Sequence, residues 1–206
     1  MYIVNKYFMF ERLVAFGCSF TRGTALDDVW DFKNNKSIYP HPSKYAWPQL
    51  LANELNLECL NLGKGGLSNK AIWHEAVNFN FQQLDLVIIH WSFLDRYHFF
   101  EDKNKGFILD HSSKNKRDKA FFKYLHSDYD MLNDLYLRMN HINTLHNNIQ
   151  HILIDPIDNV PWNNVTPIDV YLNEYKIKYP RANDNSHPGM LAHQEFAMQL
   201  LQTLKY

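Results

Sequence analysis

Four short apolar runs punctuate the chain, each bounded by turn-forming or polar residues. They cover residues 13–16, 57–62, 84–91 and 151–155, and the run at 84–91 is the longest. Strands that are buried on both faces of a parallel sheet have such unbroken apolar runs, whereas half-exposed strands alternate apolar and polar positions. We therefore predict buried strands at 13–16, 84–91 and 151–155, and a further strand at 57–62.

Stretches with helical spacing lie between and after these runs. Residues 47–55, a segment beginning at Ser68 or Asn69, residues 119–147 and the segment from Met190 onward repeat apolar positions every three to four residues. The segment 119–147 is predicted to form one helix, or two helices joined near Ser127. Residues 24–45 and 101–119 are polar and are predicted to be loops.

Alternation of strands and helices predicts an α/β fold with a mainly parallel sheet covered by helices on both faces. Right-handed crossovers would place the carboxyl ends of all strands on one edge of the sheet, where ligands bind in open α/β folds. The turn at Ser19, the glycine-rich turn 63–66 and Ser92 each follow a predicted strand. We expect these three segments to converge on that edge.

The length, net charge and cysteine content of the chain exclude several classes of function. The chain has 206 residues, a formal net charge of −1 and two cysteines. We expect a single domain over residues 1–206, no nucleic-acid or membrane partner, and neither a metal nor another cofactor. The first ten residues lack the layout of a signal peptide and no apolar stretch could span a bilayer, so a cytoplasmic location is predicted. The oligomeric state is not predicted.

The polar turns contain the groups needed for acyl transfer. Ser19 would be a nucleophile on a sharp turn, or simply the cap of a helix. His187 could act as its base, and Asp184 lies close enough in sequence to orient the imidazole. Alternatively, Asp184 and Asn185 are turn residues and His187 is a residue at the start of a helix. Backbone N–H groups of the glycine-rich turn could stabilise an oxyanion. Asp155, at a strand end, is the alternative acid.

Three blocks of sequence resemble those of the SGNH (GDSL-like) hydrolase family. The segment Gly-Cys-Ser-Phe-Thr at 17–21 resembles the first block, Asn-Leu-Gly-Lys-Gly-Gly at 61–66 the second, and Asp-Asn-Ser-His-Pro at 184–188 the last. The resemblance covers nearly the whole chain. It implies a three-layer α/β/α sandwich of flavodoxin-like type, with Ser19 as nucleophile, His187 as base and Asp184 as its partner.

Two positions depart from the family pattern. Cys18 stands where the first block usually has Asp, and we expect it to be a small buried residue. Ser92 stands where the third block usually has the Asn that completes the oxyanion hole, so the resemblance implies Ser19, Gly66 and Ser92 as oxyanion donors. Arg96 is an alternative donor, and Trp91 and Arg96 are candidate substrate-binding residues.

The predicted function is that of a serine esterase that hydrolyses a carboxylic ester of a small molecule or glycan. Abundant aromatic residues favour an O-acetylated carbohydrate as substrate. A non-catalytic carbohydrate-binding or interaction module with the same fold is the main alternative, because the third block is altered. A nucleotide-binding protein that uses residues 63–66 is disfavoured, since neither phosphate-binding glycine pattern is present.

Overall fold

The sheet has four parallel strands in the order β4-β1-β5-β8, in a computed structural model that describes residues 10–38, 41–102, 106–111, 113–157 and 165–204. Strand β1 covers Arg12–Phe16, β4 Glu58–Asn61, β5 Asp85–His90 and β8 Ile149–Ile152. The central pair is in register from Arg12 opposite Asp85 to Phe16 opposite Ile89. Every residue of β5 is buried, including Asp85 and His90 at its two ends, as the apolar run between them predicted.

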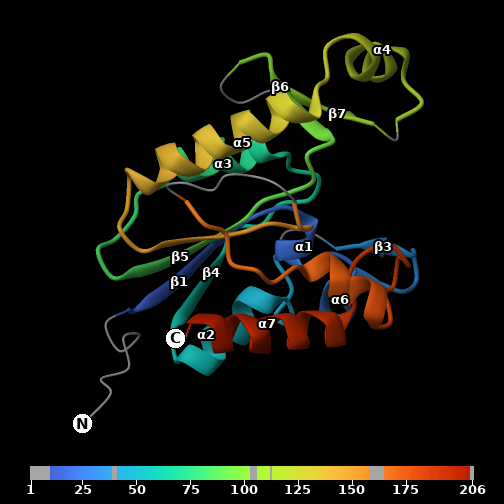
Figure 1. Ribbon diagram of the computed structural model, residues 1–206. Coiled ribbons are helices and arrows are strands. Elements are labelled where there is room, and N and C mark those ends of the chain that lie inside the picture. Colours follow the sequence, from blue (N-terminus) through green and yellow to red (C-terminus); the bar gives the residue numbers. More distant parts are fainter. Residues whose placement is uncertain (1–9, 39–40, 103–105, 112, 158–164, 205–206) are drawn as a thin grey trace.

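Helices cover both faces of this sheet (Figure 1). One face carries α2 (Trp47–Leu55), α6 (Leu172–Lys178) and α7 (Met190–Leu204), and the other carries α3 (Asn69–Val77) and α5 (Asp128–Asn143). Alternate residues of β1 separate the two cores: Leu13 and Ala15 pack with α2 and α7, whereas Val14 and Phe16 pack with α3 and α5. The three-layer α/β/α fold is therefore confirmed.

The predicted elements correspond closely to the observed ones. The strand expected at 151–155 is displaced, because only His151 and Ile152 of that run lie in β8, which begins at Ile149. The segment 119–147 does form two helices, α4 (Lys116–Tyr124) and α5. Ser127 caps α5 by accepting a hydrogen bond from the backbone N–H of Asp130. The helix after the glycine-rich turn is capped by Ser68.

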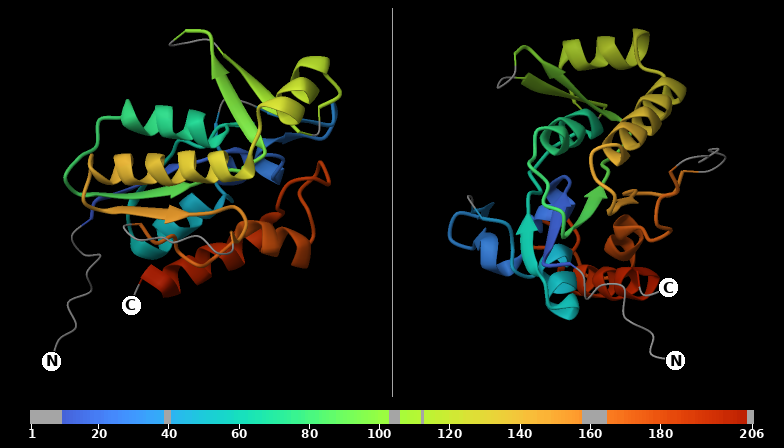
Figure 2. Two further views of the ribbon diagram at one scale, coloured as in Figure 1. Left: turned by 45° about the horizontal axis from the view of Figure 1, so that its top comes forward. Right: turned by 90° about the vertical axis from the view of Figure 1, so that its left-hand side faces the viewer.

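Both segments predicted as loops contain regular structure. Residues 106–110 form β7 (Gly106–Asp110), which pairs antiparallel with β6 (Arg96–Phe100), and α4 begins within the second predicted loop. This hairpin and α4 project above α3 and α5 (Figure 2). Residues 24–45 contain a 3₁₀ helix, η2 (Asp27–Val29), and a small hairpin of β2 (Trp30–Asp31) and β3 (Lys36–Ser37). Short pairings of two to five residues are too brief to produce a recognisable periodicity.

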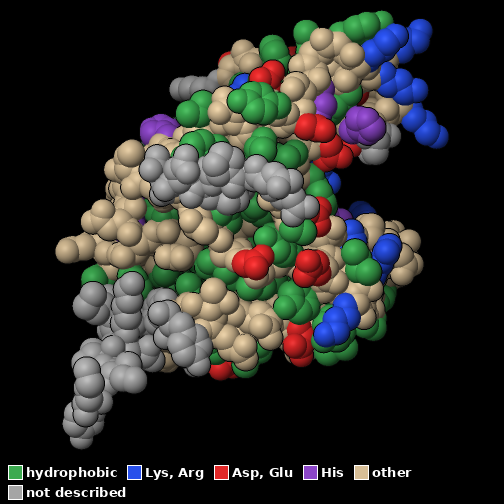
Figure 3. Space-filling model, in the orientation of Figure 1, with side chains coloured by type: hydrophobic (Ala, Val, Ile, Leu, Met, Phe, Trp, Pro, Cys, Tyr) green, Lys and Arg blue, Asp and Glu red, His purple; other side chains and the backbone are tan. Residues whose placement is uncertain are grey.

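Several side chains of the second predicted loop are solvated, as expected. Lys114, Lys116, Arg117 and Lys119 are exposed, and Figure 3 shows basic side chains gathered over α4. Lys103 and Lys105 lie outside the described residues, as does Trp162. Among the described helices, none combines the length and the apolar character that crossing a membrane requires.

Candidate active site

Ser19 is the first residue of the one-turn helix α1 (Ser19–Arg22), directly beyond the carboxyl end of β1. The sharp turn depends on Gly17, because a Cβ at this position would lie 2.0 Å from Oγ1 of Thr21. Cys18 is fully buried, as expected of a small core residue. Ser19 itself is 5% exposed, so it lies at the floor of the site rather than on an open surface.

The glycine-rich turn after β4 is tied to the turn after β1. Nδ2 of Asn61 donates to the carbonyl of Thr21 at 2.8 Å, and its Oδ1 accepts from the N–H of Gly63 at 3.0 Å. The N–H of Lys64 donates to the carbonyl of Gly17 at 3.1 Å. A Cβ on Gly63 would lie 2.6 Å from the backbone nitrogen of Arg22, so glycine permits this approach. The two turns thus form one unit.

Asp184 and His187 are hydrogen-bonded to each other. Oδ2 of Asp184 lies 2.5 Å from Nδ1 of His187, while Oδ1 accepts from the backbone N–H groups of Ser186 and His187, both at 3.0 Å. Partial burial alone would raise the pKa of Asp184, but these hydrogen bonds outweigh it and lower the pKa. An ionised carboxylate held in this way fixes the ring orientation and favours the Nδ1–H tautomer, which leaves Nε2 as the proton acceptor.

Phe20 connects this pair with the Ser19 turn. Its ring meets that of His187 edge-on, with centroids 5.8 Å apart, so the imidazole lies against the residue that follows Ser19. Asn183 fixes the histidine segment from the other side, because its Nδ2 donates to the carbonyl of Ala25 and to Oδ1 of Asp27, both at 2.9 Å. The segment 24–31 therefore helps to position the candidate base.

Ser92 is the second residue beyond β5, and it is buried. Its backbone N–H donates to Oδ1 of Asn69 at 2.6 Å, and its Oγ lies 3.5 Å from Nη1 of Arg96. Arg96 also stacks over the ring of Phe93, with its Cζ 5.0 Å from the centroid. The structure thus places Arg96 beside Ser92, and its Nε also lies 3.8 Å from Oδ2 of Asp110.

The predicted substrate contact of Trp91 is wrong. Trp91 has no exposed surface, and its Nε1 donates to Nδ1 of His151 at 3.0 Å within the core. It occupies the position after β5 where a side chain points into the layer of α3 and α5 rather than toward the sheet edge. Trp30 and Trp47 are also buried, whereas Trp73 in α3 is half-buried.

Asp155, the alternative acid, is engaged elsewhere. Its Oδ1 accepts from Nδ2 of Asn173 at 2.7 Å, in contrast to the carboxylate of Asp184, which contacts the imidazole. The structure therefore favours Asp184 as the partner of His187.

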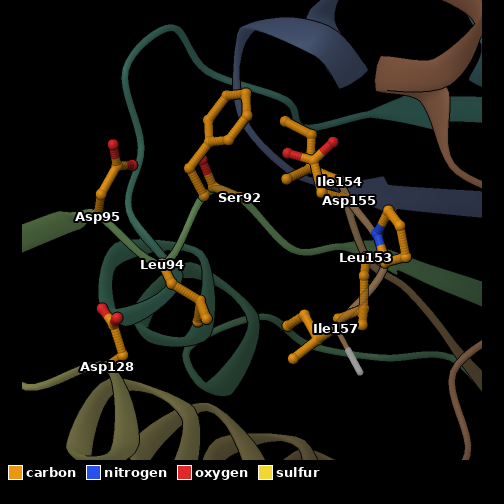
Figure 4. A pocket seen from close by; sticks show the side chains of 10 residues that line it. Ser92, Leu94, Asp95, Asp128, Leu153, Ile154, Asp155 and Ile157 are labelled. Carbon is orange, nitrogen blue, oxygen red and sulfur yellow. The ribbon is translucent and has the colours of Figure 1, made fainter. Parts of the chain in front are cut away.

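A pocket of about 280 Å³ opens beside Ser92 (Figure 4). Apolar side chains, including Leu94, Leu153 and Ile157, form its wall. Asp95 and Asp128 lie on one side and Asp155 on the other. A cavity that combines apolar walls with carboxylates suits a neutral ligand that has both carbon faces and hydroxyl donors.

Two residues near this edge were not singled out as functional by their sequence. Lys176 comes from α6, a helix absent from the predicted order, and its Nζ lies 5.2 Å above the ring of Phe20. Desolvation, reinforced by the positive charges of Arg181 and Arg96, lowers its pKa. Asn69 was expected only as a possible helix cap, a role that Ser68 fills. The altered third block is the feature of the sequence that points to the need for another donor nearby.

No group of three or more His, Cys, Asp or Glu side chains that could hold a metal ion occurs among the described residues.

No protein-family model matches the sequence, and no curated protein is similar to it in sequence. Solved structures do share its fold. A family two carbohydrate esterase from Cellvibrio japonicus superposes with a TM-score of 0.53 at 15% identity, covering 94% of this chain and 60% of its own. A carbohydrate esterase whose active site displays divergent catalytic and non-catalytic binding functions gives 0.52 at 12% identity, with 94% and 64% covered.

The chain has the fold of carbohydrate esterases. A third example, the family 2 enzyme from Corynascus thermopiles (Myceliophthora fergusii), which has an additional carbohydrate-binding domain, gives a TM-score of 0.52 at 13% identity. This chain spans less than two thirds of the length of each of the three esterases. At these identities the likeness establishes the fold, which is the one that the resemblance to the SGNH hydrolases implied.

Proposed function

We propose that this protein is a serine esterase in which Ser19 attacks the ester carbonyl and forms an acyl-enzyme. Nε2 of His187 would accept the Ser19 proton and deliver it to the leaving alcohol, and Asp184 would stabilise the imidazolium. Water, deprotonated by the same histidine, would then release the acid. The N–H groups of Ser19 and Gly66 would hold the oxyanion, with Ser92 as a further donor.

One observation carries this proposal. An imidazole whose Nδ1 is held by a carboxylate at 2.5 Å packs against Phe20, the neighbour of Ser19. The contact with Phe20 supports the proposal, because it brings the Asp184–His187 pair near the end of β1, where Ser19 supplies a hydroxyl. The positive φ of Gly66, +75°, supports its role in turning a backbone N–H toward the site.

The pocket beside Ser92 favours a neutral, hydroxylated substrate. Carboxylates of Asp95, Asp128 and Asp155 would accept hydrogen bonds from hydroxyl groups and would repel an anion, while the apolar wall suits a sugar ring face. The names of the fold neighbours, which are carbohydrate esterases, agree with this choice. We therefore propose an O-acetylated carbohydrate as the substrate class, with Arg96 as a contact.

The test is hydrolysis of p-nitrophenyl acetate by the wild type and by Ser19→Ala and His187→Ala. We expect activity to fall to the background rate in both variants while circular dichroism shows an intact fold. An O-acetylated xylan, assayed by acetate release, then tests the substrate class. Glu54→Gln, which changes an exposed carboxylate near the end of α2, is the matched control and should retain activity.

The non-catalytic binding module makes the opposite prediction. If the wild type hydrolyses no faster than Ser19→Ala and a fluorophosphonate fails to label Ser19, the esterase proposal is rejected. Retained binding of a glycan by the unlabelled protein would then support the module. Labelling of Ser19 without hydrolysis of the acetate would show an activated nucleophile whose substrate is another ester.

A further inference from the structure

Asn69 occupies a position that neither helix capping nor core packing explains. It is the first residue of α3, and the cap of this helix is supplied by Oγ of Ser68, which accepts from the N–H of Ala71. The side chain of Asn69 is therefore not used by its own helix. Only 7% of the residue is exposed, and burial of a primary amide is unfavourable unless its polar atoms find partners.

The oxygen of this amide has a partner on the adjacent loop. Oδ1 accepts from the backbone N–H of Ser92 at 2.6 Å. Since a backbone N–H can only donate, the oxygen must be the atom that faces Ser92, which settles the orientation of the amide. Asn69 thus links the start of α3, which follows the glycine-rich turn, to the loop after β5.

The nitrogen of the same amide remains available. Nδ2 makes no hydrogen bond to any residue that the structure describes. It is not fully buried either, because it is absent from the described buried side-chain atoms that lack a partner. Nδ2 therefore has some exposed surface, although the residue as a whole is buried. Its amide plane is already fixed through Oδ1, so little entropy would be lost when it donates.

We propose that Asn69 supplies, from the start of α3, the oxyanion-binding amide that Ser92 cannot supply from the third block. Nδ2 would donate to the oxygen of the tetrahedral intermediate beside the N–H groups of Ser19 and Gly66. Ser92 contributes through its backbone, which holds the amide in place. This inference rests on the proposed esterase function and removes the main structural argument for a non-catalytic site.

The decisive variant is Asn69→Asp, which has the same shape and keeps an oxygen to accept from Ser92 but loses the Nδ2 donor. We expect kcat for p-nitrophenyl acetate to fall by about 10²–10³, the usual effect of one lost oxyanion donor, with KM little changed. Asn69→Ser, which lacks the added negative charge, should show a loss in the same direction. Asn78→Ala, at the other end of α3, is the control and should retain kcat.

A second measurement separates oxyanion binding from a structural role. A trifluoromethyl ketone adds to an active serine and places a negative oxygen in the oxyanion site, so its affinity should fall in parallel with kcat in both Asn69 variants. Melting temperatures show whether each Asn69 variant is folded. If one variant is unfolded, the folded one decides between oxyanion binding and a structural role.

The outcomes distinguish the two proposals. If the wild type is active, Ser19→Ala is inactive, and the folded Asn69 variants keep wild-type kcat and ketone affinity, Asn69 is not an oxyanion donor and the esterase function stands. A loss of kcat with unchanged ketone affinity also rejects the Asn69 role. If the wild type is no more active than Ser19→Ala, the esterase function itself fails.

Discussion

The carboxylate of Asp184 binds the histidine segment at three points, through Nδ1 of His187 and through the backbone N–H groups of Ser186 and His187. One side chain thus shapes the turn and orients the ring. The same arrangement makes Asp184 both a folding determinant of this turn and a candidate electrostatic partner in catalysis.

Asp184→Asn should separate these two roles. The amide oxygen can still accept from the backbone N–H groups, but the amide cannot stabilise an imidazolium and favours the wrong tautomer. We expect kcat for p-nitrophenyl acetate to fall by about 10³–10⁴. Circular dichroism should show an unchanged fold. A kcat close to that of the wild type would remove Asp184 from the site.

Three buried histidines should make the fold sensitive to acid. Burial lowers the pKa values of His90, His151 and His193 to about 3, far below 6.5, the usual pKa. Between about pH 3 and 6.5 the unfolded chain binds protons that the folded chain does not, so the free energy of unfolding decreases as the pH falls through this window. Above pH 6.5 their contribution is complete.

His151→Gln tests this directly. It removes one of the three histidines that take up a proton when the chain unfolds. Between pH 4 and 5.5 the free energy of unfolding of the variant should therefore change with pH less steeply than that of the wild type, by about 1.4 kcal/mol per pH unit. Urea unfolding at several pH values gives both slopes. Equal slopes would contradict a neutral, buried His151.

The glycines of the second block should respond differently to substitution by alanine. At Gly63 the new Cβ would meet the backbone of Arg22 and Thr21, which cannot move aside, so we expect loss of the folded site and strong destabilisation. At Gly66 it would meet only Cδ1 of Ile108, a flexible side-chain end, and the cost is the left-handed φ, about 1–2 kcal/mol. Thermal unfolding measures both effects.

The esterase activity of Gly66→Ala tests the proposed role of the Gly66 N–H. Reorienting the peptide N–H should lower kcat by more than the modest loss of stability explains. If the variant is fully active, the Gly66 N–H does not contact the oxyanion.

An ion pair at the opposite edge of the sheet should affect stability but not chemistry. Asp85 is fully buried at the start of β5, and it accepts from Nε and Nη2 of Arg12, both at 2.9 Å, and from the N–H of Gln82. Arg12→Met leaves this carboxylate without its counter-charge, so we expect a loss of about 3–5 kcal/mol. Guanidinium chloride unfolding measures it.

The double variant Arg12→Met/Asp85→Asn is the control, because it also removes the buried charge. It should be more stable than Arg12→Met alone, and both should retain kcat while folded. A decrease in kcat with the fold intact would show that this edge is coupled to the site.

Filling the pocket beside Ser92 should discriminate between substrates. Ile157→Trp would replace a small aliphatic side chain with an indole ring beside Leu94 and Leu153. If the alcohol part of the substrate binds there, KM for acetylated xylan should rise while kcat/KM for p-nitrophenyl acetate changes little. An equal effect on both substrates would argue that the pocket does not bind the sugar.

The sheet and its two covering layers could be predicted because burial on both faces leaves an unbroken apolar pattern, as in 84–91, and because amphipathic helices repeat visibly. The convergence of three turns on one edge followed from the handedness of crossovers alone. The β6–β7 hairpin could not be predicted in this way. Its residues are largely only partly buried, and its pairing depends on neighbours supplied by α3 and α4 rather than on a period of its own.

Within the site, the residues of the proposed acid–base pair were easier to predict than the side chains that a substrate can reach. Asp184 and His187 are close in sequence, so a turn suffices to join them. Trp91 and Ser92 both follow the end of β5. Because successive side chains point in opposite directions there, Trp91 points into the core whereas Ser92 lies at the sheet edge beside the pocket. Asn69 was hidden for a different reason, since its partner Ser92 belongs to another strand and only the folded sheet brings the two together.

The site is assembled from both ends of the chain. Ser19 follows the first strand, whereas His187 lies three residues before the start of α7. His193 of that helix accepts from the backbone N–H of Trp47 in α2. A ribosome that adds about 5–20 residues per second would expose the serine on the order of ten seconds before the histidine. The nascent chain would thus carry an unactivated hydroxyl until α7 docks. Completion of the fold and onset of hydrolysis would then be the same event.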